Sequence, residues 1–139
     1  MRRCTAYLAM AVAAGITLAG CGGAGSGTVG PRMSAAAPVA ASVGPHGGQR
    51  VSIDATDMLR FAPMRITAAP GTLTITLHDT GSYPHNIDFP SLHVRSGDVN
   101  GDPGSMSTTV TLHLRKPGRY PFKCTYHSTA GMTGVLIVR

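Results

Sequence analysis

The sequence lacks several residue types that common protein classes depend on. Its 139 residues include no glutamate and no tryptophan, and aromatic residues make up only 5% of the chain. The aspartates form no paired-carboxylate motif of the kind that acid–base catalysis uses. A chain poor in Leu, Glu and Lys is not typical of a helical bundle or coiled coil. The length excludes a two-domain enzyme, since one domain needs ~100 to 200 residues. We therefore expect a protein that is not an enzyme.

The chain also lacks an apolar run of the ~20 residues that a membrane-spanning helix needs. Residues 8–19 are apolar or small and follow the basic pair Arg2-Arg3, a pattern that indicates a secretory signal. The signal ends in Leu-Ala-Gly-Cys at 18–21, which resembles the lipobox of bacterial lipoproteins. That resemblance implies cleavage before Cys21, lipidation of its thiol and anchoring on the extracytoplasmic face of the cell membrane. The alternative is an ordinary signal peptide followed by a chance cysteine.

Composition divides the chain into three parts. Residues 1–20 are the expected signal peptide, and residues 21–48 are a tether rich in Gly, Ala, Ser and Pro without a helical or strand period. Residues 49–139 remain for one small domain, which we expect to be monomeric.

The domain has the periodicity of strands. Apolar and polar residues alternate in 51–55, 73–78 and 109–114, and a continuous apolar run occupies 134–138. No long segment carries a helical stripe. The spacing of these strands and of the turns between them predicts an all-β, antiparallel sandwich.

Cysteine is scarce in the expected mature domain. Cys4 leaves with the signal and Cys21 is predicted to carry lipid, so Cys124 has no partner for an internal disulfide. Small exported domains usually add disulfides or a metal to a limited core. We therefore expect a metal to occupy Cys124.

The residues around Cys124 indicate which metal this is. They read Cys-x2-His-x4-Met and supply Cys124, His127 and Met132, while His85 lies upstream in a Pro-His-Asn segment. A thiolate, two imidazoles and a weak thioether form the ligand set of a blue-copper site. The alternatives are a buried structural thiol, a core methionine, a turn histidine at position 85, or zinc, which prefers four strong ligands.

The segments 84–87 and 118–135 resemble the ligand motifs of plastocyanin-like cupredoxins. The resemblance implies a Greek-key β-sandwich with one copper ion bound by His85, Cys124, His127 and Met132. It further implies that Asn86 steadies the loop carrying Cys124. The expected function is one-electron transfer to a redox protein; the alternative is a copper-binding module for sequestration or delivery. Lys123 stands where plastocyanins usually have Tyr, which argues against a photosynthetic partner.

The sequence is basic, with 12 Lys and Arg against 6 acidic residues. Arg115, Lys116, Arg119 and Lys123 cluster in the sequence close to Cys124. We expect this cluster either to attract anionic lipid or to steer an acidic redox partner, or to be an ordinary solvated face. No aromatic stacking platform accompanies it, so nucleic acid is not an expected partner.

Overall fold

The alternating segments of the sequence become strands with one buried and one exposed face. The computed structural model describes residues 37–139. In it, β3 (Gln49–Thr56) buries every second side chain, and β6 (Gly71–Asp79) and β9 (Ser107–Leu114) follow the same pattern. The predicted signal peptide, the lipidation site Cys21 and the first part of the tether lie outside the described residues. Within 37–139, no helix has the length and apolar character needed to cross a bilayer.

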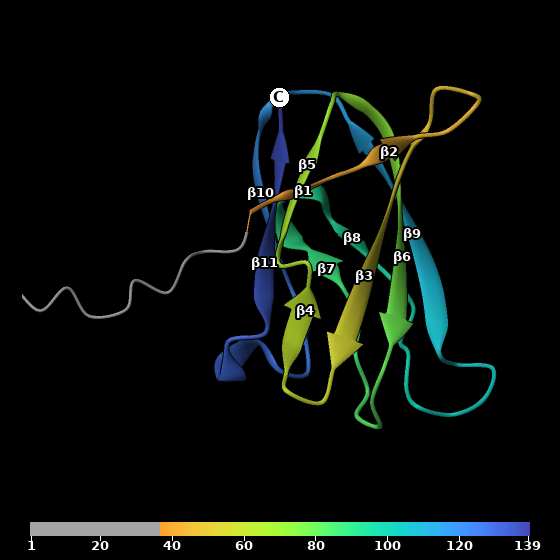
Figure 1. The fold of residues 1–139 in the computed structure, drawn as a ribbon. Coiled ribbons are helices and arrows are strands. Elements are labelled where there is room, and N and C mark those ends of the chain that lie inside the picture. Colours follow the sequence, from red (N-terminus) through yellow and green to blue (C-terminus); the bar gives the residue numbers. More distant parts are fainter. Residues whose placement is uncertain (1–36) are drawn as a thin grey trace, which may run out of the picture. The chain divides into compact units, whose positions relative to one another are not determined.

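Two sheets pack face to face as a sandwich (Figure 1). The first sheet has the order β1 (Val39–Ala40), β5 (Arg65–Ala68), β11 (Thr133–Val138), β10 (Gly118–Lys123), β7 (Asp88–Phe89) and β8 (Val94–Arg95). The second has the order β2 (Ser42–Val43), β3, β6 and β9, with β4 (Arg60–Ala62) also paired to β3. Two short 3₁₀ turns, η1 (Pro90–Leu92) and η2 (Ser128–Ala130), complete the described part.

The predicted β-sandwich is confirmed, but its sheets are mixed rather than purely antiparallel. The pairs β3–β6, β5–β11 and β1–β5 are parallel. The chain leaves the second sheet after β4, forms β5 in the first sheet and returns as β6. This crossing between layers brings β6 back alongside β3 in the same direction. Alternation in the sequence shows which face of a strand is buried but not the direction of its neighbour.

The folded domain begins earlier than the sequence predicted. The end of the expected tether, 21–48, contains β1 and β2, which pair with β5 and β3 respectively. Between them, the amide of Ala41 donates to the carbonyl of Thr67 over 2.8 Å. This short strap therefore crosses from one sheet to the other (Figure 1). Strands of two residues are too short to leave a period in the sequence, which explains the misplaced boundary.

Aromatic packing in the core fixes the strand that leads to Cys124. The ring centroid of Phe122 on β10 lies 5.3 Å from the ring centroid of Phe61 and 5.2 Å from that of Phe89. Phe122 and Cys124 are both buried and two residues apart, so they point to the same side of the strand. The core thus determines where the thiol lies, at the end of the sandwich where β10 stops.

Candidate metal centre

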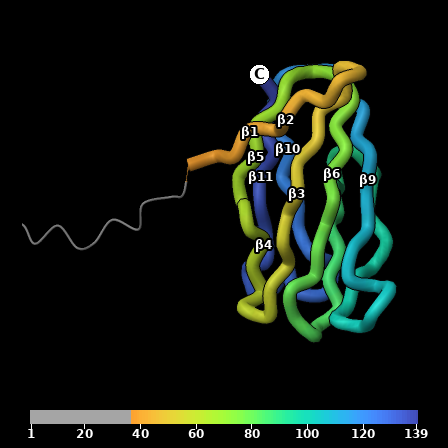
Figure 2. The backbone as a smooth tube through the Cα atoms, turned by 45° about the vertical axis from the view of Figure 1, so that its right-hand side comes forward, coloured from red at the N-terminus to blue at the C-terminus, as the bar shows by residue number. Residues whose placement is uncertain are grey.

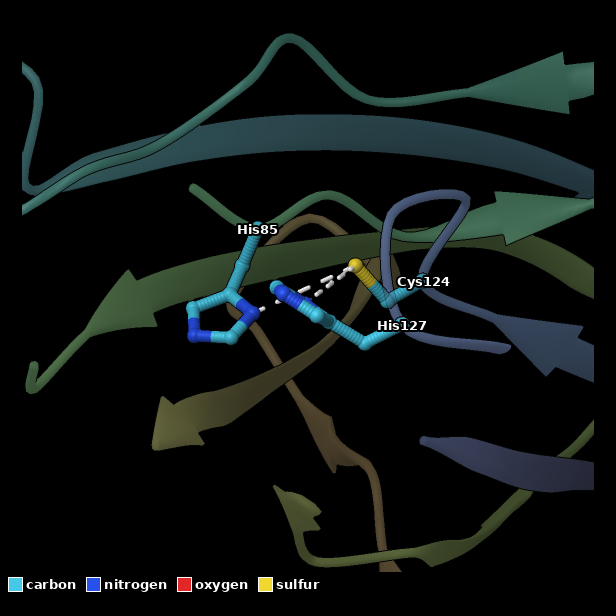
Figure 3. Close-up of side chains that lie close together, drawn as sticks. All are labelled: His85, Cys124 and His127. Carbon is cyan, nitrogen blue, oxygen red and sulfur yellow. Dashed lines mark hydrogen bonds between the residues drawn. The ribbon is translucent and has the colours of Figure 1, made fainter. Parts of the chain in front are cut away.

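Three potential ligands from two distant parts of the sequence meet at this end of the sandwich. Cys124 and His127 lie on the loop between β10 and β11, and His85 lies on the connection between β6 and β7 (Figure 3). Their candidate ligand atoms all lie within 4.8 Å of one another. His85 and Cys124 are fully buried, and His127 is partly exposed.

The geometry fits a metal in a trigonal plane. Cys124 Sγ lies 4.0 Å from Nδ1 of His85 and 3.7 Å from Nδ1 of His127. For a metal–sulfur bond of about 2.3 Å, a metal–nitrogen bond of about 2.1 Å and an angle of about 120°, two such donors lie about 3.8 Å apart. Both imidazoles therefore present the same ring nitrogen to one point beside the thiol.

Backbone hydrogen bonds hold His85 in position, and burial sets its charge state. Its amide and carbonyl exchange two hydrogen bonds of 2.8 Å with Val99. Burial lowers the pKa of His85 below its usual value of 6.5; Asp79 and Asp57 oppose this shift, while His127 adds to it. The imidazole is therefore held neutral near pH 7, the form whose nitrogen lone pair can bind a metal.

Met132 lies on the same closed loop. The amide of Cys124 donates to the carbonyl of Met132, and the amide of Met132 donates to the carbonyl of His127, each over 3.1 Å. The Met132 side chain is fully buried. These bonds fold the three motif residues into one compact unit. The assignment of the Met132 thioether as the axial ligand stays a prediction.

Asn86 joins the two parts of the site. Its Oδ1 accepts from the amide of Thr125 over 2.9 Å, and its Nδ2 donates to the Thr125 hydroxyl over 2.8 Å. Thr125 directly follows Cys124, so the structure places Asn86 where the resemblance implied, against the loop that carries the thiol. Asn86 is itself fully buried. Such contacts orient metal ligands and tune the metal.

Asp98 and Tyr126 extend this network, and the sequence analysis missed both residues. Asp98 Oδ1 accepts from Asn86 over 2.9 Å, and its Oδ2 accepts from the Tyr126 hydroxyl over 2.6 Å. The hydrogen bond from Tyr126, followed by that from Asn86, lowers the pKa of Asp98, and the same bond raises the pKa of Tyr126. Asp98 lies in the connection between β8 and β9. Its only signal in the sequence is a single carboxylate far from the ligand motif.

A second carboxylate holds the loop that precedes His85. Asp57 Oδ1 accepts from the amides of Ser82 and Tyr83 over 2.8 and 3.2 Å. These two hydrogen bonds lower the pKa of Asp57 below its ordinary value. The turn after β3 is thereby fastened to the metal site.

Aromatic side chains surround the exposed edge of His127. The ring centroids of Tyr83 and Tyr126 each lie 6.3 Å from the centroid of the His127 imidazole. Both tyrosines are about half exposed. Pro84 is exposed beside them. The buried metal site therefore reaches the surface through His127, at an apolar and aromatic rim.

Most of the basic cluster expected near the site lies elsewhere. Arg115 and Lys116 fall in the turn before β10, and Arg119 is the second residue of that strand. Five steps of about 3.3 Å separate the two ends of β10, or about 17 Å. Lys123 lies beside Cys124, but the other three are at the opposite end of the sandwich. Proximity in the sequence was misleading because an extended strand carries the chain away quickly.

Comparison with known proteins agrees with this geometry. The cupredoxin-like domain family matches residues 33–138. The chain belongs to the cupredoxin family. A chloroplastic plastocyanin of Oryza sativa subsp. indica is 36% identical over 118 residues, covering 76% of this chain and 74% of the relative. A chloroplastic plastocyanin of Chlamydomonas reinhardtii is 31% identical over 111 residues, covering 74% of this chain and 75% of the relative.

Solved structures show the same fold. The metal-binding domain of the Cu(I)-exporting P-type ATPase CopA of Streptococcus pneumoniae has a TM-score of 0.60 at 20% identity, covering 74% of this cupredoxin and 96% of that chain. Auracyanin A, a blue copper protein of Chloroflexus aurantiacus, has a TM-score of 0.54 at 19% identity, covering 65% and 98%.

The cofactor of this cupredoxin is copper. The cluster of two histidines and a cysteine, with Met132 buried on the same loop, fits a type 1 copper site. The chemistry of the donors agrees, because thiolate and thioether suit Cu(I) while imidazole suits both oxidation states. The cluster lies in a buried setting, and only His127 is open to solvent.

Proposed function

We propose that this cupredoxin is a one-electron carrier that is anchored by lipid on the extracytoplasmic face of the cell membrane. One observation carries the electron-transfer part: a buried thiol faces Nδ1 of two imidazoles at 4.0 and 3.7 Å, and only His127 reaches the surface. Bound copper would supply the one-electron exchange between Cu(II) and Cu(I).

The surrounding residues suit that task because they hold the ligands still. Val99 fixes His85, and Asn86 fixes the loop of Cys124, so the ligand positions do not depend on the metal alone. A rigid set of mixed soft and nitrogen ligands serves both oxidation states with little rearrangement. A redox protein would dock over the exposed edge of His127. The proposal assigns no chemical transformation of a substrate to this site.

Voltammetry of the copper-loaded protein tests the proposal. We expect one reversible one-electron wave, with matching oxidation and reduction currents over repeated scans. A matched variant, Thr125→Ser, keeps the hydroxyl that bonds Asn86 and should keep the wave. Copper loss on reduction, or an irreversible wave, would exclude a carrier.

The second candidate is a copper-binding module for sequestration or delivery. It is favoured by two exposed thioethers, Met58 and Met106, which are 80% and 50% exposed and lie on turns at the same end as the site. Thioethers bind Cu(I) well. Mixing the Cu(I)-loaded protein with an apo acceptor separates the two functions. Rapid transfer that slows in M58L/M106L would support delivery, and retention of copper would support the carrier.

The membrane anchor is tested separately. We expect Cys21→Ser to move the protein from the membrane fraction to the soluble fraction or into the medium. Cys4→Ser is the matched control and should leave the distribution unchanged. Persistent membrane association of the Cys21→Ser protein would contradict lipidation at this residue.

A further inference from the structure

The charges of the described domain are divided between its two ends. Five cationic side chains gather at the end opposite the metal site, which we call the basic end: Arg50, Arg115, Lys116, Arg119 and Arg139. All five are exposed. No aspartate of the described residues lies at this end. The six aspartates fall in the half of the molecule that holds the metal site, where four cationic side chains accompany them.

Strand register places these cations together although they come from separate segments. Gly118 pairs with Val138 and Gly71 with Leu114, so the turn containing Arg115 and Lys116 lies at the same end as Arg139. The amide of Arg139 also donates to the carbonyl of Ala68 over 3.0 Å. Figure 2 shows the connection from β9 to β10, the turn from β2 to β3 and the C-terminus at this end of the sandwich.

A hollow opens beside Arg50, one of these cations. It has a volume of ≈ 520 Å³ and is lined by Arg50, His46, Thr72, Thr74 and the glycine-rich turn at 44–48. A guanidinium group and hydroxyl groups are donors that suit phosphate oxygens. The hollow lies at the basic end, where the described residues 37–139 place no aspartate.

We propose that the basic end docks on an anionic phospholipid surface and thereby holds the copper site away from the membrane. Anionic lipid attracts each nearby Lys or Arg, strengthening binding about fivefold per residue. The excess of carboxylates at the other end is repelled by the same surface. Both effects favour the orientation in which the basic end faces the membrane and the metal site faces away from it.

A lipid surface fits the basic end better than a protein partner does. Protein interfaces are built around an apolar, often aromatic centre. Tyr83, Tyr126, Met58 and Met106, which are all exposed, lie at the metal end. In the other half, the exposed large apolar side chains are Val43 and Val39, and neither is aromatic. The two ends thus suit different partners, with lipid at one and a protein at the other.

The proposed anchor would not orient the domain by itself. Residue 37 lies sixteen residue-to-residue steps after Cys21, and a chain of that length reaches at most about 55 Å when fully extended. This reach exceeds the length of an eight-residue strand, about 27 Å, so either end of the sandwich could approach the bilayer. Charge would decide between the two orientations.

Hydrogen exchange of the full chain on vesicles tests the proposal. The protein is reconstituted on phosphatidylcholine vesicles with or without about one third phosphatidylglycerol, and amide exchange is followed by mass spectrometry. We expect the anionic lipid to protect the amides of 44–50 and 114–119 and to leave those of 125–131 unchanged. Salt at about 1 M, where the Debye length is about 3 Å, should remove the protection.

Two charge-matched variants separate docking from net charge. R115Q/K116Q/R119Q removes three cations from the basic end and should weaken docking about a hundredfold, so that the protection disappears. R60Q/R95Q/K123Q removes three cations from the metal half and should keep the protection of the amides at the basic end. Thermal unfolding of each variant confirms that it is folded.

Three results would overturn the proposal: no added protection on anionic vesicles, protection of 125–131 instead of the basic end, or equal loss of amide protection in both triple variants. Exchange is read in the same way with or without copper. The outcome is therefore independent of whether the protein carries electrons or delivers copper.

Discussion

Asn86 connects the two halves of the metal site, and its replacement by alanine gives the sharpest test of that connection. The change removes three hydrogen bonds: two to Thr125, of 2.9 and 2.8 Å, and one of 2.9 Å to Asp98. At about 1 kcal/mol net for each bond, Asn86→Ala should lower the free energy of unfolding of the apo protein by about 3 kcal/mol. Thr125→Ala removes only the hydroxyl bond and should cost about 1 kcal/mol.

Urea unfolding of the apo variants measures this difference, with the m-value as a check that the two-state comparison holds. Copper release from the loaded variants gives a second reading, and Asn86→Ala should lose copper faster than Thr125→Ala. Equal destabilisation by the two variants, or a cost below about 1 kcal/mol for Asn86→Ala, would refute the bridging role.

Three further predictions follow from packing, ligation and pH. Gly134→Ala should destabilise the fold by about 1–3 kcal/mol, because a Cβ there would collide with the Phe122 ring and lie 2.7 Å from the carbonyl of Met64, whereas Gly48→Ala meets no atom within 4 Å; equal thermal stability of the two would contradict this. Met132→Leu should keep the thiolate–copper colour and shift the reduction potential, since the axial ligand tunes it; an unchanged potential would show that the thioether is not a ligand. The pKa of His85 is lowered from 6.5, so the unfolded chain takes up this proton first and apo stability should fall as pH drops below 6.5; unfolding midpoints that rise over that range would show the opposite sign.

Sequence alternation was sufficient to predict the long strands but not their arrangement. The predicted segments 51–55, 73–78 and 109–114 became β3, β6 and β9 with the expected buried faces. The strand β5 escaped notice because its four residues, Arg65–Ala68, are mostly buried and show no alternation. Its parallel pairing with β11 depends on a crossing between layers, for which the local sequence carries no signal.

The metal ligands were easier to predict from the sequence than the residues that hold their loops in place. His85, Cys124 and His127 are brought together as the motif spacing indicated. Asp98 and Asp57 contribute through loop contacts that span long sequence separations, such as the bond between Tyr126 and Asp98. The charge cluster was misplaced for the same reason, since β10 carries Arg119 and Lys123 to different ends of the sandwich.

The visible spectrum of the full chain with one equivalent of Cu(II), before and after ascorbate, tests the central claim most directly. An intense blue band that bleaches on reduction and returns on reoxidation is expected, because thiolate-to-copper charge transfer requires Cys124 bound to the metal. Cys124→Ser should lack the band. A colourless wild-type protein that still binds Cu(I) would contradict the carrier and favour copper delivery. Failure to bind either ion would contradict the metal site itself.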